Sequence, residues 1–99
     1  TPRKMTLFKT APVINFQVSD QDKHTIIELY THDRPGLVST VAQVFLQCGI
    51  QLFNAKLITL VDQVEDIFFI TSDSGKPLTR YQKEKLTYAL EKALTIDET

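Results

Sequence analysis

Three short segments of the sequence carry residue types that could do chemistry. His32-Asp33 sets an imidazole beside a carboxylate, as in the metal centres of phosphohydrolases, but such a centre needs further His and Asp ligands. The one other imidazole, His24, lies eight residues upstream. Cys48 lies in an apolar run, which favours a buried thiol over a nucleophile, and Gly75-Lys76 lacks the second glycine and the Ser or Thr of a phosphate loop. The sequence therefore predicts no catalytic or metal site.

A fourth segment, residues 33–37, has the composition of a turn that leads from a strand into a helix. It reads Asp33-Arg34-Pro35-Gly36-Leu37. The backbone N–H groups at such a helix start, with the helix dipole behind them, are a natural seat for a carboxylate or phosphate. An arginine beside the turn could also hold a carboxylate in bidentate fashion. The alternative is a plain capped turn with a solvated arginine, and the residues alone leave both interpretations open.

A helix must follow this turn. Apolar residues recur on one helical face from Leu37 to Cys48. We expect Pro35 at the first helical position, where a missing N–H is harmless, and Asp33 just upstream as an acceptor for free N–H groups. Gly49 is expected to end the helix in a left-handed conformation, with Ile50 packing back onto the last turn.

Strand patterns surround this helix. Residues 12–18 and 24–31 predict an antiparallel hairpin, and residues 50–60 and 64–71 predict two further strands. A second helix is expected to begin at Thr79, because Gln82 three residues later completes a capping box. The expected order is strand, strand, helix, strand, strand, helix.

The two late strands are apolar on both faces. Alternation puts Phe53, Ala55 and Leu57 on one face, while Ile67 and Phe69 fall on the face of the sheet that two helices cannot cover. An antiparallel sheet that faces water should have a polar outer face. We therefore favour burial of the outer face by a second copy or a sister domain over scattered exposed apolar residues.

Composition and charge restrict the class of protein. The 99 residues carry 11 Lys and Arg against 12 Asp and Glu, one Cys and no Trp, as in one small domain of an ordinary protein. A net charge of -1 gives the chain no positive electrostatic field that would attract the phosphate backbone of DNA or RNA, so we expect no nucleic acid as a partner. No apolar run approaches a membrane span, and a single cysteine fits a reducing, cytoplasmic setting. The expected division is a linker or disordered leader over residues 1–11 and a single domain over 12–99, cut from a longer protein.

Four runs together resemble the ACT domain family. They are His32-Asp33-Arg34-Pro35-Gly36-Leu37, Cys48-Gly49-Ile50, Asn54-Ala55-Lys56-Leu57-Ile58-Thr59 and Val64-Glu65-Asp66-Ile67-Phe68-Phe69-Ile70. The nearest resemblance, over about residues 12–94, is to the C-terminal ACT domains of bacterial bifunctional uridylyltransferase/uridylyl-removing enzymes. ACT domains have a ferredoxin-like α+β fold, but too few residues follow the second helix for its last strand. We therefore expect residues 12–18 to occupy the sheet edge where that last strand would lie. This gives a permuted ββαββα order with two helices on one face of a four-stranded antiparallel sheet.

The resemblance also implies a function. ACT domains commonly bind a small effector near this turn and so control an attached enzyme; here the implied effector is glutamine. The residues implied by position are Asp33, Arg34, Pro35, Gly36, Leu37 and Asn54. The enzyme acts on the nitrogen-regulatory PII protein in the bacterial cytoplasm, and its catalysis, with a divalent metal such as Mg²⁺, lies in other domains. This piece would then hold no cofactor and would not itself be an enzyme. The alternative is an ACT domain that binds no ligand and serves as a dimerisation or docking surface.

Overall fold

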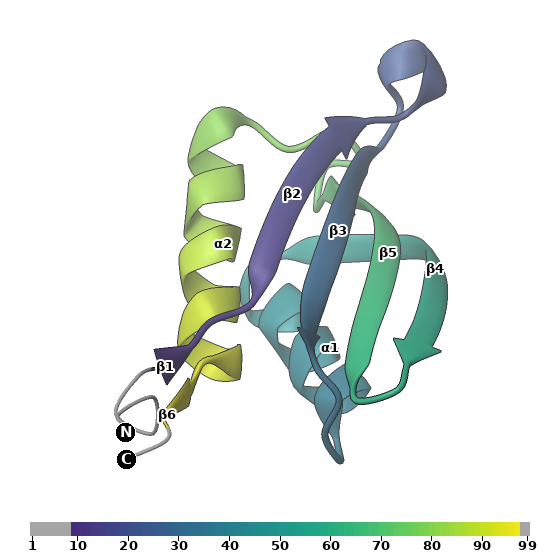
Figure 1. The fold of residues 1–99 in the computed structure, drawn as a ribbon. Helices are drawn as coiled ribbons and strands as arrows, with labels where there is room; N and C mark the ends of the chain where they lie inside the picture. Colours follow the sequence, from purple (N-terminus) through teal and green to yellow (C-terminus); the bar gives the residue numbers. More distant parts are fainter. Residues whose placement is uncertain (1–8, 98–99) are drawn as a thin grey trace, which may run out of the picture.

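A computed structural model of the chain describes residues 9–97. Its main body is a four-stranded antiparallel sheet with two helices against one face (Figure 1). The strands are β2 (Val13–Val18), β3 (Thr25–His32), β4 (Ile50–Leu60) and β5 (Gln63–Ser72), and the helices are α1 (Leu37–Gln47) and α2 (Arg80–Leu94). The strand order β2-β3-β5-β4 places the first strand of the hairpin at the sheet edge, so the ferredoxin-like architecture and the permuted ββαββα order are confirmed.

A second, two-stranded sheet joins the ends of the described chain. β1 (Lys9–Thr10) pairs antiparallel with β6 (Ile96–Asp97) beside the last turn of α2 (Figure 1). β1 falls within the segment expected as a linker, and β6 follows the second helix, where the sequence showed no strand pattern. Two-residue strands carry too little periodicity for recognition.

The core lies between the inner face of the sheet and the helices. Alternation directs Ile27 and Leu29 of β3 and Phe68 and Ile70 of β5 to this face, where all four are at least 98% buried. The helices add residues spaced three or four apart: Leu37, Val41, Val44 and Phe45 from α1, and Leu86, Leu90 and Leu94 from α2. The face predicted for the first helix is therefore confirmed.

The start of α1 differs from the prediction. The helix begins at Leu37, with Gly36 as its N-cap at φ +76°, so Pro35 lies two residues before the first helical position. The side chain of Asp33 makes no capping hydrogen bond; its backbone N–H instead donates to the carbonyl of Asp62 at 2.9 Å. A left-handed N-cap favours glycine, and Gly36 takes this position. The helix therefore begins after Gly36 and not at Pro35. At the other end Gly49 has φ +69°, as expected.

A β-bulge between Leu52 and Asn54 changes the faces of β4. Leu52 pairs with Ile70 and therefore shares the inner face with Ala55 and Leu57, while Phe53 packs edge-to-face on His24 with ring centroids 4.7 Å apart. The prediction that grouped Phe53 with Ala55 and Leu57 was wrong, because one extra residue reverses the alternation.

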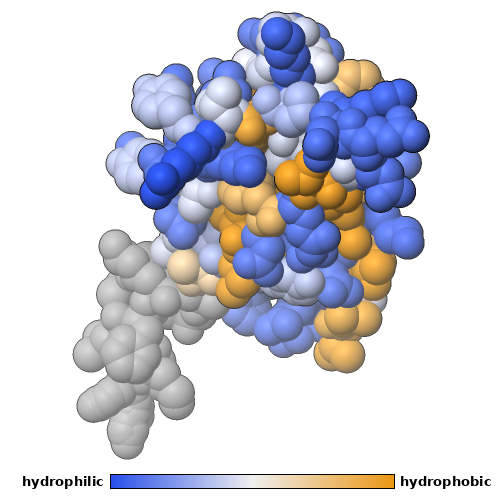
Figure 2. Space-filling view, turned by 90° about the horizontal axis from the view of Figure 1, so that it is seen from above, coloured by the Kyte–Doolittle hydropathy of each residue, from blue (hydrophilic) through white to orange (hydrophobic). Residues whose placement is uncertain are grey.

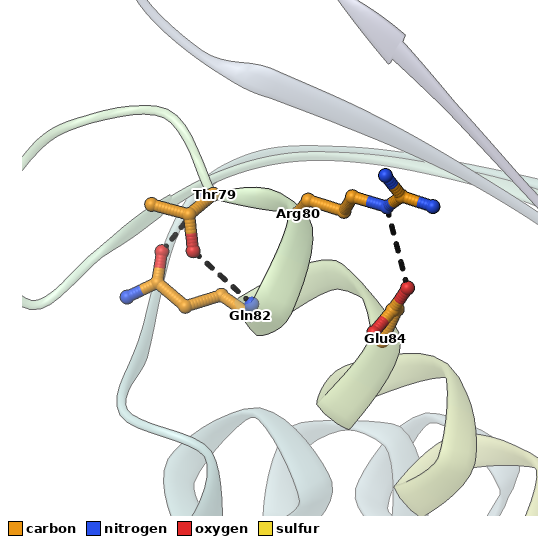
Figure 3. Close-up of polar contacts among 4 residues, drawn as sticks. All are labelled: Thr79, Arg80, Gln82 and Glu84. Carbon is orange, nitrogen blue, oxygen red and sulfur yellow. Dashed lines mark hydrogen bonds and ion pairs between the residues drawn. The ribbon is translucent and has the colours of Figure 1, made fainter.

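The start of α2 is a complete capping box, as the sequence predicted. The Thr79 hydroxyl accepts from the backbone N–H of Gln82 at 3.2 Å, and the Gln82 side chain accepts from the N–H of Thr79 at 2.8 Å (Figure 3). Arg80 and Glu84, which are one helical turn apart, form an ion pair with 3.5 Å between Nε and Oε2, and their side chains are 93% and 68% exposed (Figure 3).

We expect these two features to contribute differently to stability. Thr79→Ala should lower the free energy of unfolding by about 1 kcal/mol, because it leaves the backbone N–H of Gln82 without its side-chain acceptor. Arg80→Ala should lower it by less than about 0.5 kcal/mol, since exposed ion pairs are screened. Chemical denaturation of both variants measures the difference, and equal losses would contradict the assignment of the box as the main stabiliser of this helix start.

Candidate functional site

A pocket of about 270 Å³ opens where α1 begins. Its residues come from the β3–α1 turn and the first turn of α1, and from inner-face positions of β4 and β5. They are Asp33, Arg34, Gly36, Leu37, Val38, Ser39, Leu57, Thr59, Val64 and Asp66. Four residues expected from the sequence, Asp33, Arg34, Gly36 and Leu37, therefore line one cavity.

The remaining two expected residues lie outside this lining. Pro35 is exposed in the turn. Asn54 is exposed on β4 and pairs with Phe69, on the opposite side of the sheet from Leu57 and Thr59. Its side-chain oxygen already accepts from the backbone N–H of Ala55 at 2.9 Å. Alternation along β4 is the physical reason, because Asn54 is separated by an odd number of residues from Leu57 and Thr59 and so lies on the other face.

The helix start presents backbone donors to the pocket. The N–H of Leu37 reaches the carbonyl of Arg34 at 3.3 Å, and that of Thr40 reaches Gly36 at 2.9 Å. Between them, the N–H groups of Val38 and Ser39 have no acceptor within residues 9–97. Together with the helix dipole, these two donors can bind an anionic group.

Arg34 lines the pocket but is tied to another element. Its Nη2 donates to the backbone carbonyl of Leu94, in the last turn of α2, while its Nε is buried without a partner among the described residues. A cation at the carboxyl end of a helix is favourable because it opposes the negative end of the dipole. The arginine therefore links the β3–α1 turn to the end of α2.

The residue that sequence reasoning missed as a site residue is Asp66. Alternation along β5 places it between Val64 and Phe68 on the inner face, where it is only 2% exposed. Burial raises the pKa of this carboxyl, and the charge of Asp33 raises it further, while a hydrogen bond with the backbone of Ile58 lowers it. An acidic residue at an inward position of an otherwise apolar strand face was the signal available in the sequence.

Comparison with known proteins shows one group of enzymes that contain a similar segment. The chain is 42% identical over 89 residues to the bifunctional uridylyltransferase/uridylyl-removing enzyme of Nitrosococcus oceani, which covers 90% of the chain. The chain is homologous to one segment of that enzyme. The enzymes of the same name from Pseudomonas syringae pv. tomato and Legionella pneumophila (strain Corby) are 37% and 38% identical over 97% and 92% of the chain. No family model and no solved structure matches.

The matched segment is a small part of each relative. The chain spans 10% of the length of the Nitrosococcus enzyme and 11% of the other two. The homology therefore covers one small segment of each of these enzymes. Within residues 9–97, no helix is long and apolar enough to cross a membrane.

The buried carboxyl predicts a pH-dependent variant effect. Because the pKa of Asp66 is raised in the folded state, the stabilising effect of its protonated form is fully present below the unfolded pKa and is lost as pH rises through the folded pKa. Asp66→Asn replaces the ionised carboxylate with a neutral group of the same shape. We expect it to raise the Tm by a few degrees at pH 7.

Thermal unfolding of the parent chain and of Asp66→Asn over a range of pH tests the direction of this change in Tm. The gain in Tm over the parent chain should shrink as pH falls from the folded pKa of Asp66 toward its unfolded pKa, and it should be absent below the unfolded pKa, where Asp66 is neutral in both states. Asp20→Asn, an exposed change at the opposite end of β3, serves as the control and should leave Tm nearly unchanged. A Tm at pH 7 lower for Asp66→Asn than for the parent would contradict the account.

Proposed function

We propose that this chain is an ACT-type regulatory domain that binds glutamine and controls the uridylyltransferase/uridylyl-removing enzyme to which it is homologous. The observation that carries the proposal is the pocket that joins the β3–α1 turn to the inner face of β4 and β5. The enzyme would act on the PII protein in the bacterial cytoplasm. Its nucleotidyl transfer and hydrolysis, and any Mg²⁺ that they need, would belong to the other nine-tenths of its length.

The size and lining of the pocket support an amino-acid effector. A volume of about 270 Å³ lies just below the roughly 300–1,000 Å³ typical of small-molecule sites, which favours a ligand smaller than a nucleotide. The N–H groups of Val38 and Ser39 would receive the effector's α-carboxylate. Ser39 and Thr59 both line the pocket, and because their hydroxyls can donate or accept, these residues suit a side-chain amide.

The same geometry supports a route for regulation. An effector that repositions the β3–α1 turn also acts on Arg34, and through it on the carbonyl of Leu94 at the end of α2. The strand that follows, β6, pairs with β1, so the ends of the described chain meet at this place (Figure 1). The effector can shift the enzyme only by its difference in affinity for two arrangements, typically about 1–3 kcal/mol.

A direct test is an NMR titration of the labelled chain with glutamine, using glutamate and leucine as controls. We expect saturable shifts at residues 33–39, Thr59 and Asp66 with glutamine, and weaker or no shifts with the controls. Unchanged spectra at saturating glutamine, with the chain folded, would overturn the proposal.

The turn glycine provides a matched pair of variants. Gly36 and Gly75 have φ +76° and +82°, and a Cβ at either position meets no atom within 4 Å, so valine imposes the same backbone strain at both. Gly36→Val should reduce glutamine affinity at least about tenfold, because it shifts the N–H groups of Val38 and Ser39 and fills the edge of the pocket. Gly75→Val, in the β5–α2 loop, should bind as the parent chain does. Equal affinities of the two variants would show that the site lies elsewhere.

A docking role is the second candidate, and the outer face of the sheet supports it. Ile26, Ile58, Ile67 and Phe69 point to this face and remain half-buried without a covering element among residues 9–97. Seen from above the fold, apolar side chains also lie among hydrophilic ones on that side of the molecule (Figure 2). A stable dimer that is indifferent to amino acids in analytical ultracentrifugation would favour this function.

A further inference from the structure

The side chain of Asp66 has no cationic partner, although it is almost completely buried. It is 2% exposed, and its side chain still lines the pocket at the start of α1. No Lys, Arg or His within residues 9–97 forms an ion pair with it. Buried carboxylates are costly unless they are paired, so this side chain favours a ligand with a positive group.

The other charged residues that line the pocket do not pair with the Asp66 carboxylate. Asp33 is a second carboxylate on the same lining, and its charge opposes ionisation of Asp66. Arg34 also contributes to the lining, but its guanidinium donates to the carbonyl of Leu94. The pocket thus has acidic groups from β5 and the turn, and backbone donors from α1, which is the complement of a zwitterion.

A metal ion fits this arrangement less well than an ammonium group. The described residues contain no group of three or more His, Cys, Asp or Glu side chains that could hold a metal. An ammonium needs only a few acceptors, and a buried carboxylate with a second carboxylate beside it provides them.

We propose that Asp66, assisted by Asp33, binds the α-ammonium of the effector, so that the site selects an α-amino acid over the carboxylic or 2-oxo acid with the same side chain. This inference rests on the proposed function, since it takes the ligand's carboxylate to lie at the N–H groups of Val38 and Ser39. It assigns to Asp66 the specificity that distinguishes an aminated metabolite from its deaminated counterpart.

The test combines two ligands with two variants. Glutamine and 4-carbamoylbutanoic acid, which is glutamine without its amino group, are titrated by calorimetry into the parent chain, Asp66→Asn and the control Asp20→Asn. We expect the parent chain and Asp20→Asn to prefer glutamine by about 10- to 100-fold, the usual loss when a charge-assisted hydrogen bond is removed. In Asp66→Asn this preference should fall to within about threefold of unity, with the acid bound nearly as before.

Each outcome bears on a separate claim. If glutamine binds the parent chain and Asp66→Asn keeps the full preference for glutamine over 4-carbamoylbutanoic acid, Asp66 does not bind the ammonium group, while the proposed glutamine site stands. If Asp66→Asn loses affinity for both ligands equally, Asp66 only shapes the pocket, and the inference is overturned. If neither ligand binds the parent chain, both the inference and the proposed function fail.

Discussion

Burial of one face of the sheet is the constraint on which the rest of this structure depends. Ile27, Leu29, Phe68 and Ile70 can leave water only if both helices pack on the same side. The chain must therefore turn sharply from the end of β3 to the start of α1. Gly36 allows this turn with a left-handed backbone, and the helix begins beside the inner face rather than over all of it. The pocket is the part of that face that α1 does not cover.

The main architecture was predictable because its signals are local and repeated. The helical spacing from Leu37 to Phe45, the capping box at Thr79 and the alternation along β5 each extend over one or more turns or strand repeats. The permuted order followed from counting residues after the second helix. What could not be predicted depends on single residues or tertiary pairing: the bulge at Leu52/Asn54, the late helix start, and the pairing of β1 with β6.

The site was predictable in part for the same reason. Residues 33–37 form a contiguous motif, and the fold brings Asp33, Arg34, Gly36 and Leu37 to one cavity. Asn54 lies outside the cavity because strand alternation sets it on the other face of β4 from Leu57 and Thr59. Asp66 was visible as an acidic residue in an apolar strand, yet its meaning depends on which face packs against α1 and on the register that sets it opposite Leu57. Sequence patterns do not contain that information, because it arises from the pairing of β4 with β5.

The central claim is that helix donors and a buried carboxylate together form one amino-acid site. A crystal structure of the chain grown with saturating glutamine tests it most directly. We expect glutamine in the pocket, with its α-ammonium nitrogen about 3 Å from the Asp66 carboxylate and its α-carboxylate about 3 Å from the N–H groups of Val38 and Ser39. An empty pocket under these conditions, or glutamine bound with its carboxylate against Asp66, would contradict it.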